Sequence, residues 1–262
     1  MASEVDEQEL GFRDSPDRAT LSCLLYMARV MELRDFVRFF FGIIKSMGAF
    51  SQALTPDSRQ AFEAEASKYK LVSYDFSNHR QFVNETMLSR AVESFDLYVL
   101  LILREIFEAK PEILKSEGSI DIATVIDLKS FDSVVTFLTE RKIHELSYKS
   151  LDDLQKYIHS RTGLALFRTD AAFDAALLAS EVRNLIAHND CRVNDIFDRR
   201  LKGLKRPLDD LPISKAGKFI IEDEWLRQVS YTLDAAVFDF DVAASDKFGL
   251  QTMNPKTSFT FR

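Results

Sequence analysis

The sequence predicts an all-α protein, a helical bundle, and three observations carry that prediction. Glycine and proline are scarce, at 8 and 6 of 262 residues, so the chain has few of the residues that separate short strands. Apolar side chains recur at spacings of three and four over long stretches, as the buried face of a helix requires. Phenylalanine is abundant, at 22 residues, which provides for a large core and leaves apolar surface for an interface.

The N-terminal part of the chain contains a polar tail and two expected helices. Residues 1–17 are acidic and polar and are expected to be disordered. A helix is expected at 21–47, where apolar residues keep helical spacing and charged residues fall between them. Thr55 and Pro56 mark the start of a helix at 56–70, because proline at the first helical position lacks only an N–H that would be unpaired there.

The longest expected helix runs from about 79 to 110, and Pro111 ends it. Its apolar stripe is wide, which indicates burial on more than one side of the helix. The residues that form this stripe are Met87, Leu88, Ala91, Val92, Phe95, Tyr98, Val99, Leu101, Ile102 and Ile106.

The C-terminal half of the chain continues the helical pattern. Ser150 and Asp170 are expected N-caps, and Gly163 is an expected C-terminal stop. A loop is expected at 201–218, with a short strand at 218–221. The helices expected in this half span 131–146, 151–160, 170–189 and 222–246.

These elements suggest three parts. Residues 1–75 form an N-terminal tail and helical extension, residues 76–247 form the main helical domain, and residues 248–262 form a C-terminal tail. The tail has no hydrophobic period, so it is expected to be mobile or to lie along the surface. No internal repeat or low-complexity tract is visible.

Composition limits the function classes. The net charge of −7 and the pI near 5.3 argue against a protein that coats nucleic acid, although a local basic site stays open. Cys23 and Cys191 suggest neither a disulfide frame nor a zinc ribbon, and they are read as reduced thiols of a cytoplasmic protein. No secretory signal is visible, and no apolar run approaches the roughly 20 residues of a membrane span.

Common catalytic motifs are not visible either. The sequence has no glycine-rich phosphate loop and no serine-hydrolase elbow. Its four histidines show no metal-ligand spacing, so neither a metal nor a cofactor is expected. His144 and His159 are interpreted as structural or surface residues.

One segment combines chemically useful residues in an apolar helix. Polar groups that interrupt such a helix need partners, because burying them unpaired costs free energy. Asn184 and His188 lie four residues apart and share a helix face, whereas Arg183 lies about 140° around the axis from His188. Arginine's long side chain can narrow that gap. The polar residues concerned are Glu181, Arg183, Asn184, His188 and Asn189.

Arginine and histidine together suit phosphodiester chemistry. Histidine exchanges protons near pH 7, and arginine binds phosphate through two parallel hydrogen bonds. A ribose 2′-hydroxyl that attacks its own phosphate needs proton transfer and stabilisation of growing negative charge, and it needs no metal. Spacing alone favours a structural hydrogen-bonded pair over a catalytic one.

The run EVRNLIAHN at residues 181–189 resembles the signature helix of HEPN domains, in which Arg is followed by four to six residues and then His. Here Arg183 is followed by four residues and then His188, with Asn184 directly after the arginine, as is frequent in the family. Residues 88–114 are similar to the long early helix of a bacterial HEPN branch.

Weaker similarities occur at 146–148 and 163–166, so the resemblance covers about 80–245 and leaves the first 75 residues outside it. It implies a bundle of four or five helices and, for many members, a metal-independent endoribonuclease that acts as a homodimer with Arg and His of both protomers facing one cleft. Carried over, Arg183 binds phosphate, His188 transfers protons and Asn184 orients or hydrogen-bonds, while Glu181 tunes the pair.

The residues around the motif support and complicate this reading. Residues 183–206 contain seven basic and three acidic side chains, a local net charge of +4 in an acidic chain. That reversal is typical of a nucleic-acid cleft, although a solvated loop explains it equally well. Asp190 stands where toxin members silenced by adenylylation have tyrosine, and its carboxylate is expected to repel phosphate. The expected substrate-binding residues are Glu181, Asn189, Arg192, Arg199 and Arg200.

The leading hypothesis is therefore a HEPN-type ribonuclease, a toxin or defence effector, whose partners are RNA, a second copy of the chain and an antitoxin protein. The expected dimer places the two 170–189 helices near its axis. The alternative is a non-catalytic HEPN-like dimer that binds nucleotide, RNA or a protein partner, since fold alone does not determine function.

Overall fold

The structure, a computed structural model, describes residues 16–68, 79–115, 119–202, 204 and 211–258, and all regular secondary structure in these ranges is helical. The all-α prediction is confirmed. The strand expected at 218–221 is wrong, because Lys218 and Phe219 form only isolated bridges, with Arg192 and Ile213 respectively. The expected disorder of residues 1–17 falls almost entirely outside the described residues.

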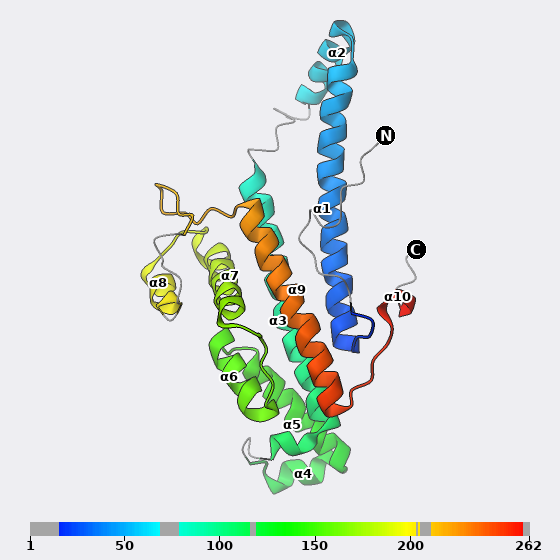
Figure 1. Cartoon of the computed structure of the whole chain (residues 1–262), viewed down its shortest axis with the longest axis vertical. Helices are drawn as coiled ribbons and strands as arrows, with labels where there is room; N and C mark the ends of the chain where they lie inside the picture. Colours follow the sequence, from blue (N-terminus) through cyan, green and yellow to red (C-terminus); the bar gives the residue numbers. More distant parts are fainter. Residues whose placement is uncertain (1–15, 69–78, 116–118, 203, 205–210, 259–262) are drawn as a thin grey trace.

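Helix α3 (Arg80–Ala109) is the centre of the bundle (Figure 1). It packs against α1 (Leu21–Ala53), α7 (Asp170–Asn189) and α9 (Asp223–Phe248), as well as the α5 helix described below. The prediction that this helix is buried on more than one side is therefore confirmed. Its fully buried residues are Leu88, Val99, Ile102, Leu103, Ile106 and Phe107.

Helix α1 behaves differently along its length. Its first turns, with Cys23 and Tyr26, are buried in the same core as α3, although the sequence assigned them to an extension. Its C-terminal half leaves the bundle and carries α2 (Pro56–Lys68) at its far end (Figure 1). The expectation that the 79–110 helix is the longest was wrong, because α1 has 33 residues against 30 for α3. An internal glycine costs a helix only about 1 kcal/mol, so Gly48 does not stop α1.

The chain between α3 and α7 forms a smaller helical layer. The 3₁₀ turn η3 (Pro111–Leu114) follows α3, and α4 (Ile122–Leu128), which was not predicted, precedes α5 (Phe131–Leu146). Ser150 caps α6 (Leu151–Thr162), as predicted.

Gly163 ends α6 with φ +63°, a left-handed conformation that glycine adopts without steric cost. The predicted stop is therefore confirmed. The cap of α7 was misassigned by one residue: the Thr169 hydroxyl, and not the Asp170 carboxylate, accepts the Ala172 N–H at 3.1 Å.

Two further short helices were missed. Asn194 caps α8 (Asp195–Leu201) by accepting two backbone N–H groups, both at 3.0 Å. Helix α10 (Pro255–Ser258) lies in the expected tail, which a backbone bridge between Ala19 and Met253 ties to the start of α1. Seven and four residues are too few for a hydrophobic period to be recognised.

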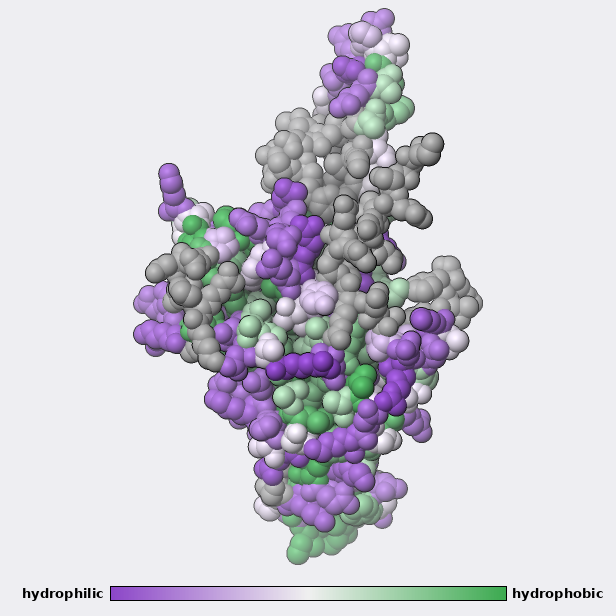
Figure 2. Space-filling view, in the orientation of Figure 1, coloured by the Kyte–Doolittle hydropathy of each residue, from purple (hydrophilic) through white to green (hydrophobic). Residues whose placement is uncertain are grey.

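Apolar side chains also gather on the surface at the end of the molecule that carries α4 (Figure 2). Helix α4 buries none of its residues, and Ile122 and Ile126 are 79% and 68% exposed. Phe36 and Phe39 are similarly exposed on the distal half of α1. Among the described residues, no helix combines the length and the apolar character that crossing a bilayer demands.

Candidate functional site

A groove of about 980 Å³ runs along α7. Its walls are α7 on one side and α3, the α5–α6 turn, the start of α6 and α8 on the others; α6, α7 and α8 are neighbours in Figure 1. Six of the eight residues proposed from the sequence line it: Glu181, Arg183, Asn184, His188, Asn189 and Arg200. The structure thus brings most of the predicted set to one open surface.

The remaining two do not line the groove. Arg192 donates a hydrogen bond to the carbonyl of Ala216 at 3.0 Å, which directs its guanidinium to the loop after α8. Arg199 donates to the carbonyl of Asp195 within its own helix at 3.2 Å. Both guanidinium groups are therefore hydrogen-bonded to backbone carbonyls, and neither residue lines the groove.

Arg183 is held from across the groove by Asp96 of α3. Its Nη2 lies 2.8 Å from the Asp96 Oδ2, and the two side chains are 28% and 40% exposed. The buried Arg183 Nε has no hydrogen-bond partner in the described part of the chain. Because the Nε is shielded from solvent, a ligand in the groove meets only the exposed part of the guanidinium.

Asp96 is electrostatically unusual for an ion-paired carboxylate. Burial raises the pKa of Asp96 from 3.8 to about 6, and Glu93 adds to the increase, while Arg183 opposes it. The charge of Arg183 thus only partly compensates for the loss of water around the carboxylate. A ligand that binds Arg183 must displace Asp96, and the raised pKa means that Asp96 accepts a proton more readily than an ordinary aspartate.

Glu181 is the buried member of the set, with its side chain 8% exposed. Its carboxylate accepts two hydrogen bonds from the Arg200 Nη1, at 3.0 and 3.2 Å, and one from the Asn184 amide at 3.4 Å. It therefore positions Arg200 and Asn184 rather than Arg183 or His188, and it presents little surface of its own to a ligand.

His188 occupies the last turn of α7, one residue before the helix ends at Asn189. Its side chain is exposed, and among the described residues it makes neither a hydrogen bond nor an ion pair. Asn189 is more constrained, because its amide donates to the carbonyl of Arg192 at 2.6 Å. The imidazole is thus an accessible group on the groove wall.

Asp190 ends α7 in a left-handed conformation with φ 49°. Its carboxylate lies 2.7 Å from the Lys218 Nζ and 4.0 Å from the Arg192 Nε. The hydrogen bond from Lys218 lowers the pKa of Asp190, so the group stays ionised but paired. Because Asp190 is not part of the groove lining, the repulsion of phosphate expected from it is reduced.

Sequence reasoning missed Asp96, although a signal was present. Asp96 lies four residues from both Val92 and Leu100, so its carboxylate stands between apolar residues of a long helix. A charge in that position needs a partner. Which arginine supplied it was not readable, because Arg183 is 87 positions away.

The α5–α6 turn contributes another part of the groove that was not predicted. Tyr148 and Lys149 line it, and Tyr148 is 79% exposed. Lys149 is half exposed and lies 3.9 Å from Glu145. The groove therefore contains an aromatic ring and a third positive side chain in addition to its two arginines.

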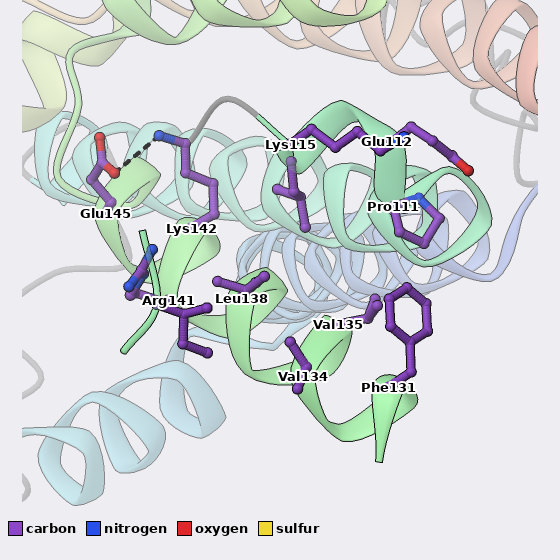
Figure 3. Close-up of a pocket in the computed structure, with 12 residues that line it drawn as sticks. Pro111, Glu112, Lys115, Phe131, Val134, Val135, Leu138, Arg141, Lys142 and Glu145 are labelled. Atoms are coloured by element: carbon purple, nitrogen blue, oxygen red, sulfur yellow. Dashed lines mark hydrogen bonds and ion pairs between the residues drawn. The ribbon is translucent and has the colours of Figure 1, made fainter. Parts of the chain in front are cut away.

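A second, smaller pocket of about 220 Å³ lies between η3 and α5 (Figure 3). Val134, Val135 and Leu138 form an apolar wall, and Lys142 and Glu145 form an ion pair of 3.0 Å at one end. The pocket has no histidine or cysteine and no Arg–His combination. The groove along α7 is therefore the better candidate for chemistry.

Nothing in the described part of the chain gathers three or more His, Cys, Asp or Glu side chains as a metal site requires. The two thiols are also poor nucleophiles. Burial raises the pKa of Cys191 to about 12 and that of Cys23 further still. Neither thiol lines the groove along α7.

In comparisons with protein-family models, with curated proteins and with solved structures, no match to this chain was found.

Proposed function

We propose that this chain is a metal-independent endoribonuclease of HEPN type, a toxin or defence effector that cuts RNA by attack of a ribose 2′-hydroxyl. One observation carries the proposal: an accessible His188 and a partly exposed Arg183, five residues apart on α7, line the same open groove. The resemblance of residues 181–189 to the HEPN signature helix supports it. The rest of the groove supplies binding groups of matching charge.

Arg183 contributes phosphate binding. A phosphate in the groove replaces Asp96 as the partner of the guanidinium, whose two terminal nitrogens provide a two-pronged contact. Arg200, which is 54% exposed, offers a second positive charge from α8. Both arginines stabilise the charge that grows on the phosphate oxygens in the transition state.

His188 contributes proton transfer. The 2′-oxygen gives its proton to a base and forms a bond to phosphorus, the bond from phosphorus to the 5′-oxygen breaks, and that oxygen takes a proton. The products are a 2′,3′-cyclic phosphate and a 5′-hydroxyl. One imidazole performs one of the two transfers, and we assign the other to the His188 of a second protomer.

A homodimer completes this scheme. One chain offers a single arginine–histidine pair, and the last turn of α7 leaves both Ala187 and His188 exposed, where a second α7 has access to them. Sedimentation at micromolar concentration should therefore show a dimer. A chain that stays monomeric under these conditions while cutting RNA would remove the shared site from the proposal.

A non-catalytic dimer that binds RNA, nucleotide or a protein partner is the second candidate. The ion pairs favour it, because Arg183 and Arg200 already have carboxylate partners at 2.8 and 3.0 Å. A binding protein only needs phosphate to compete with those carboxylates. The two candidates share the groove and differ in whether His188 moves protons.

The decisive experiment measures RNA cleavage in the presence of a chelator. The wild type should cut RNA, leave DNA intact for lack of the 2′-hydroxyl, and produce 2′,3′-cyclic phosphate ends. His188→Ala should lose about 10²–10⁴-fold in rate, as general acid–base catalysis typically contributes. Arg183→Lys should also be severely impaired, because an ammonium cannot form the two-pronged contact.

His159→Ala is a matched control, since His159 is also an exposed histidine in the last turn of a helix but does not line the groove. It should cut at the wild-type rate. Full activity of His188→Ala would eliminate the mechanism. RNA binding without cleavage by the wild type would establish the second candidate instead.

A further inference from the structure

The α5–α6 turn presents an aromatic ring to the groove. Tyr148 is 79% exposed, although large aromatic side chains are usually at least half-buried. It lines the groove together with Asn184 and His188 of α7. Most of the ring surface is thus left open to a ligand in the groove.

The ring is also held in place. The backbone of the turn is closed by hydrogen bonds from the Ser147 N–H to Ile143, from the Tyr148 N–H to Glu145 and from the Lys149 N–H to Leu146, at 2.9 to 3.4 Å. The imidazole of His144 meets the Tyr148 ring edge to face, with centroids 5.2 Å apart. A platform that is already ordered loses little entropy when a ligand stacks on it.

The groups around the ring match the other parts of a nucleotide. Lys149 adds a positive charge beside it. Arg183 and Arg200 line the same groove, where a phosphate competes with Asp96 and Glu181 for them. The volume of about 980 Å³ lies near the upper end of the range for small-ligand pockets, which is enough for a nucleotide. Positive charge along a groove combined with an exposed aromatic ring is typical of single-strand binding.

We propose that Tyr148 is a base-stacking subsite, on which an unpaired nucleobase lies while the adjoining phosphate binds at Arg183. This inference rests on the proposed function and narrows its substrate to single-stranded RNA. A base inside a duplex is covered on both faces by its neighbours and cannot stack on a protein ring. Tyr148 contacts the base and takes no part in proton transfer.

Binding of an RNA that cannot be cut tests the subsite separately from cleavage. The probe is a fluorescein-labelled octanucleotide with 2′-O-methyl riboses, used as a single strand and as a duplex, and measured by anisotropy. Tyr148→Ala should weaken single-strand binding roughly 5- to 150-fold, the range that loss of one stacked base produces. Tyr148→Phe should bind like the wild type, because it keeps the ring.

Tyr231→Ala is the matched control, since Tyr231 is 49% exposed on α9 and lies outside the groove lining. It should not change binding. A probe with 2-aminopurine should lose emission on binding to the wild type and to Tyr148→Phe, but not to Tyr148→Ala, because stacking quenches this base.

Three results would overturn the subsite. Equal single-strand binding by the wild type and Tyr148→Ala would remove it while leaving the ribonuclease proposal intact, provided that both proteins still cut RNA. Equal losses with an abasic probe would mean that Tyr148 supports the fold and not a base. Absence of any RNA binding by the wild type would remove the subsite and the proposed function together and would favour a protein ligand for the groove.

Discussion

Two clusters of carboxylates with polar or charged partners lie against α3, and they differ in how far solvent reaches them. The core cluster joins α1 to α3 and α9: Asp241 accepts hydrogen bonds from the Thr20 N–H and hydroxyl at 2.9 and 2.6 Å, and Asp234 accepts from Tyr26 and Arg34. The groove cluster joins α3 to α7 and α8 through Arg183–Asp96 and Arg200–Glu181. In the core cluster both aspartates are at most 1% exposed; in the groove cluster Asp96 and Arg183 stay in contact with water.

The comparison shows that a raised pKa does not by itself identify a functional site. Burial raises the pKa of Asp241 to about 6, as it does for Asp96. Asp241 is enclosed by Thr20 and Tyr98, whereas Asp96 faces an open groove. The first carboxylate has a structural role, and only the second is placed where a ligand can exchange with it.

The largest effect is expected from Asp234→Ala in the core cluster. The variant removes the carboxylate that the partly buried Arg34 and the buried Tyr26 share. Loss of one partner of a buried pair typically costs about 3–5 kcal/mol of unfolding free energy. Denaturant unfolding should therefore show a much lower midpoint.

Asp96→Ala in the groove cluster should cost less than about 1 kcal/mol, because its pair with Arg183 is screened by water. Glu140→Ala, which breaks the exposed pair with Arg104, serves as a control with a similarly small cost. Equal losses in Asp234→Ala and Asp96→Ala would mean that the clusters do not differ as described.

A second, smaller effect is a pH dependence that Asp241 creates. Its folded pKa of about 6 lies above the unfolded value of 3.8, so the folded protein binds the proton more tightly. The stabilisation of the folded state by protonated Asp241 is fully present below pH 3.8 and is lost as the pH rises through about 6. Over that window the contribution of Asp241 falls by about 3 kcal/mol.

Asp241→Asn removes this titration. The difference in unfolding free energy between Asp241→Asn and the wild type should therefore change with pH between about 4 and 6 and level off above pH 7. Parallel curves for the two proteins across this range would show that the carboxylate does not titrate there. Comparing the two proteins cancels the carboxylates whose pKa is lowered, such as Asp121 and Glu145.

The smallest expected effect is a change in RNA affinity when the charge of Asp96 in the groove is removed. Asp96→Asn removes the charge that competes with phosphate for Arg183, so RNA should bind a few-fold more tightly, by up to about fivefold. The measurement is anisotropy with the uncut 2′-O-methyl probe. Glu140→Gln is the control: it removes an exposed charge that is paired with Arg104 and lies outside the groove lining, and it should leave affinity nearly unchanged. Weaker binding by Asp96→Asn would mean that Asp96 assists the ligand instead of competing with it.

Long helices with regular apolar stripes were predictable, and short elements were not. The helices around residues 131–146 and 170–189 match the structure in both bounds. Helix α8 was missed despite the capping Asn194, because seven residues make fewer than two and a half turns. The length of α1 was underestimated, because the helix continues to Ala53, beyond the expected end at 47.

The sequence by itself determined the long helices and the order of Arg183, Asn184 and His188 on one of them. Helical periodicity is a local property, so residues three to five apart have a fixed relation before any tertiary contact forms. Only the tertiary structure decided which groups stand opposite that helix. Asp96, Tyr148 and Arg200 reach the groove from three other segments, and their positions depend on how helices pack and where turns close. Packing of distant segments also separated the enclosed carboxylate of Asp241 from the open one of Asp96, a distinction that no local pattern contains.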